Sequence, residues 1–309
     1  MMSWSGWGLA FNFLIFPGFL FSAVVGLVLT WVDRIVSARV QYRRGPPVFQ
    51  PFADLFKLLL KQTIVPDGAS KTVFLLAPML GLAAMCLTSG LLFYVNFNPQ
   101  GSFVGDLIVL VYLLGLAPLA LVIGASASRN PLSAVGASRE MMLYFGYELP
   151  FLLALLVPII KSGGAIRLGE LIVAQQAGGP FLYSISGVIA ALIVLFTTQA
   201  KLGYVPFDMA EAEQEIMSGV FAEYSGASLA VFKLTKAMML FLLPLFMITV
   251  FWGGFGDWWA ILKFLLIVVL VVLMKNTNPR FRIDQALRFF WFILGVFGIV
   301  AVVLAFVRL

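Results

Sequence analysis

The sequence predicts an all-α integral membrane protein with eight transmembrane helices and an N-terminus on the outer side of the membrane. Of the 309 residues, 62% are hydrophobic and only 11% are charged, a composition typical of membrane-embedded chains. Runs of about 20 apolar residues, the length that a helix needs to cross roughly 30 Å of hydrocarbon, recur eight times. The Lys and Arg residues between these runs are distributed unequally, which predicts the orientation.

The apolar runs divide the chain into spans and loops, without a soluble domain or a low-complexity linker. The expected spans lie near residues 11–32, 73–95, 105–125, 140–160, 182–201, 229–252, 257–275 and 287–307. The expected cytoplasmic loops cover about residues 33–72, 126–139, 202–228 and 276–286. We therefore expect a single membrane domain that comprises residues 1–309.

The charged residues predict which side of the membrane each loop occupies. If the N-terminus is outside, 16 of the Lys and Arg residues fall on the inner side and four on the outer side. Loops rich in Lys and Arg stay in the cytoplasm, so this split predicts a multi-pass protein of the cytoplasmic (inner) cell membrane. The outer side has only three acidic residues, Asp106, Glu170 and Asp257. The inner face therefore carries many charges of both signs, which favours contact with another protein.

Some residue types that redox chemistry needs are missing or rare. The chain has no His and a single Cys, Cys86, within the second span. A metal site or an iron–sulfur cluster cannot be assembled from this chain alone in the usual way. Gly-rich phosphate loops and nucleophile elbows are also absent from the sequence. We therefore expect no cofactor in this chain and place any reactive centre in a partner subunit.

The first cytoplasmic loop is predicted to contain an amphipathic helix after an Arg-Arg-Gly-Pro-Pro turn. Polar residues recur at intervals of four, three and four at Gln50, Asp54, Lys57 and Lys61, and the opposite side carries Phe52, Leu55, Phe56 and Leu59. Such a helix lies flat at a membrane surface. It is either an interfacial anchor or a docking ledge for a soluble partner.

The fourth span begins with three functional candidates on one helix face. Glu140, Tyr144 and Glu148 are spaced at i, i+4 and i+8. At 1.5 Å per residue, Glu148 lies about 12 Å deeper than Glu140. An ionisable residue at such depth is rare and usually functional. The alternative is a Glu that reaches the interface because the span begins later in the sequence.

The loop after the fifth span, PFDMAEAEQEIMSGVFAEYSG at residues 206–226, holds five of the 14 acidic residues. These are Asp208, Glu211, Glu213, Glu215 and Glu223. Asp208 and Glu211 fit a capping box at the start of a helix. That helix would place Asp208, Glu211 and Glu215 on one face, with Glu213 roughly opposite.

This acidic segment has no positive neighbours in sequence. No Lys or Arg lies between Lys201 and Lys233. Partners must come from elsewhere, either from the Arg-rich first and last cytoplasmic loops or from water. Closely packed and partly buried carboxylates raise one another's proton affinity, which makes them candidates for proton exchange. A solvated acidic face is the simpler alternative.

The last cytoplasmic loop carries Arg280, Arg282 and Asp284 just before the eighth span. Anchoring by the positive-inside rule explains the arginines adequately. Asp284 is expected to pair with Arg280 or Arg288, each four residues away.

Four segments together resemble one family. They are RRGPPVFQPFADLFKLLLKQ after the first span, GASREMMLYFGYELP into the fourth, PFDMAEAEQEIMSGVFAEYSG after the fifth and PRFRIDQ before the eighth. In order and spacing they resemble the membrane subunit of respiratory complex I that joins the peripheral arm to the membrane arm. The details are most similar to the homologous subunit of energy-converting, formate hydrogenlyase-type NiFe hydrogenases and of related sulfur-reducing complexes. Quinone-using members typically have Asn where this chain has Pro47.

The resemblance implies a non-catalytic membrane subunit of an oxidoreductase complex, with iron–sulfur clusters and a NiFe or equivalent centre in its partners. Those partners would be hydrogenase-like large and small peripheral subunits, antiporter-like membrane subunits and the lipid bilayer, with no nucleic acid. The resemblance places the partner-docking surface at Arg43, Arg44, Gln50, Asp54, Lys57, Arg139, Arg280, Arg282 and Asp284. It places the proton or coupling route at Glu140, Tyr144, Glu148, Asp208, Glu211, Glu213, Glu215 and Lys236.

Three alternatives remain open at this point. The first is a quinone-site subunit of a complex I-type quinone oxidoreductase, or of a sulfur-reducing relative. The second is a stand-alone ion transporter, which should show midplane charges in discontinuous helices and an inverted repeat; no such repeat is apparent. The third is a passive anchor, in which Glu148 and the acidic segment would tolerate neutral substitutions.

Overall fold

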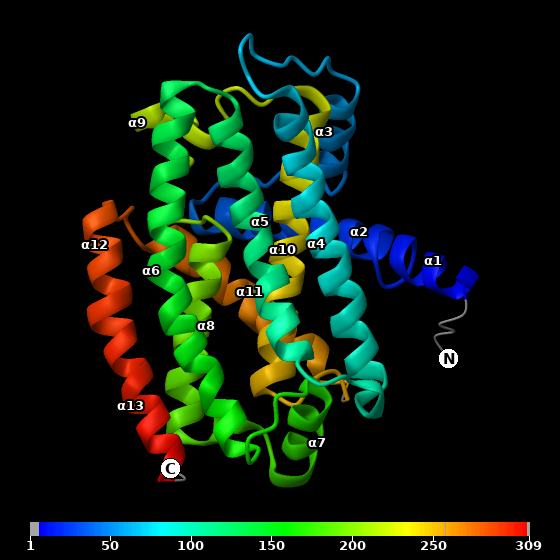
Figure 1. Cartoon of the computed structure of the whole chain (residues 1–309), viewed down its shortest axis with the longest axis vertical. Helices are drawn as coiled ribbons and strands as arrows, with labels where there is room; N and C mark the ends of the chain where they lie inside the picture. The colour runs from blue at the N-terminus through cyan, green and yellow to red at the C-terminus, as the bar shows by residue number, and fades with distance from the viewer. Residues whose placement is uncertain (1–5, 257, 308–309) are drawn as a thin grey trace.

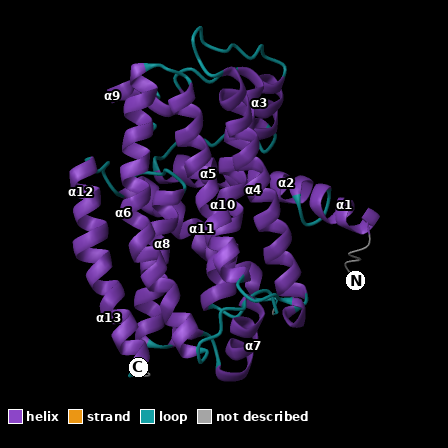
Figure 2. Ribbon diagram, in the orientation of Figure 1, coloured by secondary structure: helices purple, strands orange, loops and turns teal. Residues whose placement is uncertain are grey.

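Every regular element in the described part of the chain is a helix (Figures 1 and 2). The computed structural model describes residues 6–256 and 258–307, apart from the side chains of residues 6, 7, 9, 10 and 213. The α-helices are α1 (Gly6–Leu14), α2 (Phe19–Val40), α3 (Gln50–Leu59), α4 (Lys71–Phe97), α5 (Asp106–Ala127), α6 (Pro131–Lys161), α7 (Leu168–Gly178), α8 (Ile185–Lys201), α9 (Glu213–Ile216), α10 (Gly226–Phe251), α11 (Ala260–Thr277), α12 (Ile283–Arg288) and α13 (Gly295–Phe306). Short 3-10 turns occupy η1 (Pro99–Gly101), η2 (Phe181–Tyr183) and η3 (Gly219–Phe221), and the π-helical stretch η4 (Phe289–Leu294) joins α12 to α13.

The predicted all-α membrane architecture is confirmed. Among the described residues, seven helical stretches are long and apolar enough to cross a membrane. The expected fifth span corresponds to α8, an apolar helix of 17 residues. The last span combines α12, η4 and α13 into one stretch of 24 residues.

Helix α10 forms the centre of the bundle. In its most apolar window, 94% of residues are buried, against 56% or less in the other candidate spans. It packs against α2, α3, α4, α8 and α11. The second half of α10, from Ala237 to Phe251, is apolar on all sides, as expected for a helix in the core of a bundle.

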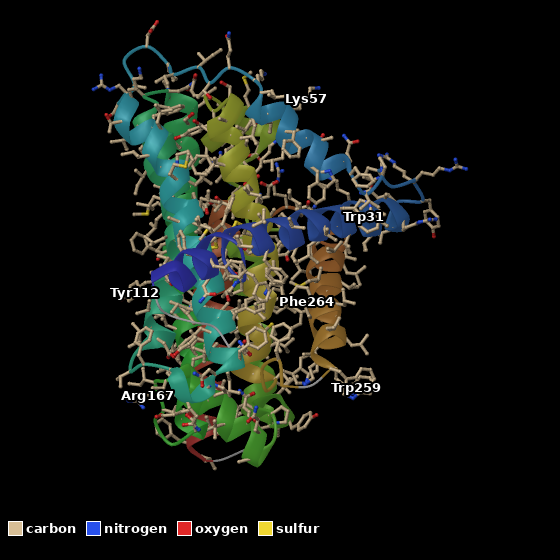
Figure 3. All side chains as sticks on the ribbon, turned by 90° about the vertical axis from the view of Figure 1, so that its right-hand side faces the viewer. Trp31, Lys57, Tyr112, Arg167, Trp259 and Phe264 are labelled. Carbon is tan, nitrogen blue, oxygen red and sulfur yellow. The ribbon has the colours of Figure 1, made fainter. Side chains whose placement is uncertain are left out.

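Helix α2 runs across the direction of α4, α5, α6 and α10 in both views (Figures 1 and 3). At the crossing, Gly26 lies directly against the backbone of α10. A Cβ atom added there would lie 2.5 Å from the Ala237 carbonyl oxygen. Glycine is therefore required for this close approach.

Residues expected on opposite sides of the membrane lie at opposite ends of the molecule. Figure 3 shows Lys57, on α3, at one end and Arg167 and Trp259 at the other. This separation agrees with the orientation that the positive residues predict.

Helix α7 was not predicted, and it packs beneath the end of α10. Gln175 donates to the carbonyl oxygens of Thr249 at 3.1 Å and Val250 at 3.2 Å, and accepts from the Gly253 amide at 2.9 Å. The Gln175 side chain thus satisfies backbone groups that α10 leaves open where it ends.

Two helices extend into the expected cytoplasmic loops. Within the loop expected at 126–139, only residues 128–130 are not helical, because Asn130 caps α6 by accepting the Leu132 amide and Pro131 starts the helix. Arg139 therefore lies inside α6. Helix α2 likewise continues to Val40, into the loop expected from residue 33. Hydropathy marks where a helix becomes apolar, and a helix can begin or end well outside that region.

The limited length of α8 positions the candidate site. This helix ends at Lys201, well short of the upper end of α6 (Figure 1). Gly203, with φ of +58°, turns the chain directly afterwards, and Pro206 follows. The end of α8 is consequently enclosed by its neighbours.

Candidate functional site

The acidic segment is an irregular loop over residues 206–212. The prediction of a helix that starts at a capping box of Asp208 and Glu211 was wrong, because α9 covers only Glu213–Ile216. Backbone groups of the loop bind distant partners: Pro206 O accepts the Phe281 amide at 3.0 Å, and Ala210 O accepts the Val220 amide at 3.3 Å. These tertiary bonds replace those that a helix would have supplied.

Three of the five acidic residues form ion pairs with residues far away in the sequence. Asp208 lies 2.8 Å from Arg280, Glu211 lies 2.6 Å from Lys236, and Glu215 lies 2.8 Å from Arg139. Arg280 belongs to the last cytoplasmic loop, as expected, whereas Lys236 and Arg139 come from α10 and α6. A simple solvated acidic face therefore does not describe these three carboxylates. The side chain of Glu213 lies outside the described residues.

The end of the acidic segment holds neighbouring elements together. Glu223 accepts a hydrogen bond from the Asn130 side-chain amide. The Tyr224 hydroxyl donates to the Phe74 carbonyl at 3.1 Å, and its ring stacks on Phe74 at 4.1 Å. Ser225 Oγ accepts the Ile64 amide at 3.2 Å. These residues thus have a structural role.

Asp208 and Glu215, two carboxyls of the acidic segment, have pKa values shifted in opposite directions. Burial, together with the charge of Glu211, raises the pKa of Asp208 against the opposing influence of Lys236 and Arg280. The hydrogen bond from Arg139 lowers the pKa of Glu215, which is exposed. Asp208 also has one buried oxygen, Oδ1, without a hydrogen-bond partner among the described residues.

A small cavity, here named the acidic cavity, lies between this loop and helices α6, α8 and α10. Its volume is about 40 Å³, enough for water. The charged residues that line it are Glu140, Lys201, Asp208, Glu211 and Lys236. Glu140 is buried at 3% exposure, and Lys236 is paired with Glu211. The cavity thus brings together charged side chains from α6, α8, α10 and the loop.

Lys201 extends this cluster toward Glu148. Its ammonium lies 2.7 Å from Glu148, with a side-chain exposure of 0% for Lys201 and 17% for Glu148. The ammonium also lies 4.4 Å from the centre of the Phe151 ring and 4.9 Å from that of Tyr147, a favourable position for a cation. Glu148 is therefore held by a buried lysine and does not reach toward an open interface.

Sequence reasoning missed Lys201, which it counted among the inner-loop lysines. The available signal was its position at the last residue of the fifth expected span, two residues before Gly203. Tyr144 was predicted to share a face with Glu140 and Glu148. Its ring lies 5.9 Å from the Lys201 ammonium, so it borders the same pair.

A second and larger cavity, here named the α2–α3 cavity, lies between α2, α3 and α10. Its volume is about 560 Å³. The residues that line it include Asp33, Arg34, Asp54, Lys57, Tyr204, Lys233 and Lys236. Lys236 therefore borders both cavities. The Tyr204 ring lies 5.2 Å from the Lys236 ammonium and 4.6 Å from that of Lys275, which pairs with Asp33 at 2.8 Å.

The amphipathic helix α3 contributes a polar cluster to this cavity. Asp54 pairs with Arg34 at 2.8 Å and accepts from Gln50 at 2.9 Å. Burial alone would raise the pKa of Asp54, but the hydrogen bonds from Arg34 and Gln50 outweigh it and lower the pKa. The apolar face of α3 packs on the bundle through Phe52 and Leu55, whereas Phe56 is 61% exposed.

The predicted docking residues fall into separate groups. Gln50, Asp54 and Lys57 belong to α3 beside the α2–α3 cavity, whereas Arg139 and Arg280 are engaged by the acidic segment. Arg43 and Arg44 are exposed in the loop between α2 and α3.

The expected pairing of Asp284 was wrong. It lies 3.5 Å from Arg282, in an exposed pair, whereas Arg280 is occupied by Asp208. Arg288 lies in the last turn of α12, in which Asp284 occupies the first turn.

The described part of the chain holds no candidate metal site, since no group of three or more His, Cys, Asp or Glu side chains there could hold a metal ion. The charged residues of the acidic segment and the acidic cavity instead form ion pairs between carboxylates and lysines or arginines. Such a set of groups can hold or move charge and protons.

Comparison with known proteins identifies the family. The sequence model of the family described as NADH dehydrogenase matches residues 12–306. The chain belongs to this family. Relatives within it include one subunit of the NADH-quinone oxidoreductase of Thermomicrobium roseum, 33% identical over 89% of this chain and 89% of the relative. The corresponding subunit from Bacillus cytotoxicus is 32% identical over 94% of this chain and 91% of the relative.

A solved structure supports the same placement in the NADH dehydrogenase family. The membrane-bound sulfane sulfur reductase, an archaeal respiratory membrane complex, has a chain that matches with a TM-score of 0.86 and 25% identity. The match covers 96% of this chain and 99% of that chain. The predicted resemblance to the complex I membrane subunit and its hydrogenase-like and sulfur-reducing relatives is confirmed.

Proposed function

We propose that this chain is the membrane-anchoring and energy-coupling subunit of a multisubunit, redox-driven ion pump in the cytoplasmic membrane. It docks a hydrogenase-like peripheral arm on the cytoplasmic side and relays a proton or an electrostatic signal to antiporter-like membrane subunits. The partners supply the iron–sulfur clusters and the NiFe or equivalent centre.

The proposal rests chiefly on a series of charged side chains that runs from the loop surface into the bundle. Arg280 and Asp208 lie at its outer end, and Glu211 with Lys236 follow in the acidic cavity. Glu140 borders the same cavity, and the pair of Lys201 and Glu148 lies at the inner end. Charged groups in a membrane protein are costly to bury and commonly mark ion pathways.

The mechanism that we propose starts in the partner. Electron transfer beside the acidic segment changes the local charge or conformation. Because Asp208 is partly buried and lies close to the charge of Glu211, its protonation and its pairing respond strongly to a further nearby charge. The response passes through Glu140 toward Glu148 and from there to the adjacent membrane subunits.

Substitution of Glu148, at the inner end of the series, and of Glu215, in the acidic segment, tests this function. Glu148→Gln and Glu215→Gln are introduced into the complex, and ions pumped per electron are measured in proteoliposomes beside the rate of electron transfer. We expect electron transfer to continue while pumping falls. Glu170→Gln, at an exposed residue that pairs with Arg167 at 3.5 Å, is the matched control. Unchanged coupling in both variants would remove Glu148 and Glu215 from the route.

The docking role has its own test. Arg43 and Arg44 are exposed, so Arg43→Glu with Arg44→Glu should repel an acidic partner surface without disturbing the fold. We expect the peripheral subunits to be lost when the membrane subunit is purified. Arg167→Glu, at the end of the molecule opposite Lys57 of α3 (Figure 3), serves as the control. Full retention of the peripheral arm by the double variant would contradict docking at this loop.

One observation favours the alternative of a quinone-site subunit. The α2–α3 cavity, at about 560 Å³, falls in the range of about 300–1,000 Å³ that is usual for ligand pockets. It combines an apolar wall, which includes Leu27, with polar groups of Tyr204 and Asp54. Leu27→Trp would narrow the cavity. If the alternative holds, this variant lowers quinone reduction; under the main proposal, reduction of protons or of a sulfur compound stays unchanged.

A further inference from the structure

Lys201 connects the acidic cavity with Glu148. It lines the cavity together with Glu140, Asp208, Glu211 and Lys236. At the same time its ammonium lies 2.7 Å from Glu148, which is not among the residues that line the cavity. Lys201 therefore borders both the acidic cavity and Glu148.

The surroundings of Lys201 allow its ammonium to move. The side chain ends among the rings of Tyr144, Tyr147 and Phe151, at 5.9, 4.9 and 4.4 Å. Aromatic faces attract a cation without the directional demands of a hydrogen bond. A lysine ammonium is a compact charge on a flexible four-carbon stem, so it can exchange one carboxylate partner for another along this wall.

Glu140, which lines the acidic cavity together with Lys201, is the second carboxyl group of this arrangement. It is 3% exposed, and no ion pair to it is found in the described part of the chain. Because an unpaired buried carboxylate is costly, the neutral carboxylic acid is the form of Glu140 that this position favours. Glu140, Tyr147 and Glu148 lie at i, i+7 and i+8, on one side of α6.

The hydroxyl of Tyr147 offers an intermediate position for a proton. Tyr147 is fully buried, and its hydroxyl has no hydrogen-bond partner in the part of the chain that the structure describes. Buried hydroxyls are rarely left unsatisfied in folded proteins. The Tyr147 hydroxyl is therefore available to bind a water molecule or the carboxyl group of Glu140 or Glu148.

We propose that Lys201 is a positioning residue that switches between Glu148 and Glu140 and thereby sets which of the two holds a proton. In the observed arrangement, Glu148 is a carboxylate paired with Lys201 and Glu140 is a carboxylic acid. In the second arrangement, the proton of Glu140 has moved to Glu148, and the Lys201 ammonium pairs with the Glu140 carboxylate. One ammonium, one carboxylate and one proton are present before and after, so the exchange is electroneutral. This inference rests on the proposed function and adds Lys201 to the route.

The test removes the charge of Lys201 and keeps its shape. Lys201→Met retains an unbranched side chain that packs well against Tyr147 and Phe151, and Lys201→Gln is a second variant in case Met does not assemble. We expect electron transfer to continue and ions pumped per electron to fall about tenfold or more, because Glu148, left without its cation, takes up a proton and holds it. Lys263→Met is the matched control and should pump normally. The Lys263 ammonium also lies beside an aromatic ring, 5.7 Å from the centre of Trp252, but at the end of α10 away from the acidic cavity.

An infrared measurement separates this role from simple packing. Removing Lys201 should add a second carboxylic acid band at neutral pH, beside that of Glu140, and Glu148→Gln in the Lys201→Met background should remove it. A lysine that only supports the fold would change the yield or stability without adding this band.

The outcomes distinguish the two proposals. Normal pumping in Lys201→Met together with failed pumping in Glu148→Gln overturns the switch and leaves the proposed function standing. The absence of the new carboxylic acid band also overturns the switch. Normal pumping in Glu148→Gln overturns the proposed function itself.

Discussion

Asp208 and Arg280 form an ion pair at 2.8 Å between segments that are 72 residues apart. The backbone bond from the Phe281 amide to the Pro206 carbonyl, at 3.0 Å, joins the same two segments. Phe207 packs against Phe281 and Phe290 beneath this junction. The acidic loop is thus fastened to the start of the last span by a charge pair, a backbone bond and an aromatic cluster.

Loss of Arg280 should destabilise the protein in a pH-dependent way. The pKa of Asp208 is already raised by burial and by Glu211, and removal of Arg280 raises it further. A carboxyl with a raised pKa binds its proton more tightly in the folded state, so stability falls as pH rises from its unfolded pKa to its folded pKa. We expect Arg280→Gln to cost about 1–3 kcal/mol at pH 7 and much less near pH 4.

Thermal unfolding in detergent at several pH values measures this effect. Asp208→Asn with Arg280→Gln is the control, because it removes both charges and should show a smaller loss with little pH dependence. A loss in Arg280→Gln that is equal at pH 4 and pH 7 would contradict the prediction.

Arg139 should determine the titration of Glu215 and contribute little to stability. Its hydrogen bond lowers the pKa of Glu215, so this contribution is present above the unfolded pKa and is lost as pH falls through the folded value. Arg139→Gln should return the Glu215 pKa to its ordinary range. Because the Glu215 side chain is 56% exposed, the change in stability at pH 7 should stay below about 1 kcal/mol.

Carbon-detected NMR titration of labelled Glu residues gives the midpoint for Glu215. Arg282→Gln, which removes an arginine of 81% exposure, should leave that midpoint unchanged. An unaltered midpoint in Arg139→Gln would show that the ion pair is not formed.

Gly124 should be intolerant of alanine because of Tyr224. A Cβ atom at Gly124 would lie 2.3 Å from the Tyr224 hydroxyl oxygen and 3.1 Å from its ring carbon Cζ. We expect Gly124→Ala to cost about 1–3 kcal/mol by overpacking. Tyr224→Phe should cost about 1 kcal/mol through its bond to the Phe74 carbonyl.

The combination of the two substitutions is the informative measurement. Phe at position 224 removes the atom closest to the added methyl group, so the double variant should lose less stability than the sum of the single variants. Strict additivity in thermal unfolding would mean that the two side chains do not meet.

Gln175 should be needed to hold α7 beneath the end of α10. Its side chain binds two carbonyl oxygens and one amide around residues 249–253. Gln175→Leu keeps the side-chain size but leaves these buried groups unpaired, so we expect a loss of about 2–4 kcal/mol. Gln176→Leu, at the neighbouring exposed residue, should change stability little. Hydrogen exchange of the Gly253 amide should rise in the first variant only.

The spans and the shared face of Glu140, Tyr144 and Glu148 on α6 could be predicted because they depend on local sequence. Apolar length defines the spans, and the helical repeat places Glu140, Tyr144 and Glu148 on one side wherever α6 begins. The beginning of α6 itself was less predictable, because residues 131–139 are too polar to stand out by hydropathy although they continue the same helix.

The pairing of the charges could not be predicted. The acidic segment has no Lys or Arg within it, and Glu211 and Glu215 find their partners on α10 and α6. Lys201 appeared to be an ordinary inner-loop lysine. Its burial depends on the early end of α8 beside the longer α6, a relation between two helices.

The sequence by itself determined the membrane class, the family and the positions of the carboxylates and predicted the orientation, since these follow from composition, charge and motif order along one chain. Only the tertiary structure decided which carboxylate meets which cation and which of them are buried. Ion pairs form through space, at distances such as the 2.7 Å between Lys201 and Glu148, and burial depends on neighbouring helices that the local sequence does not specify.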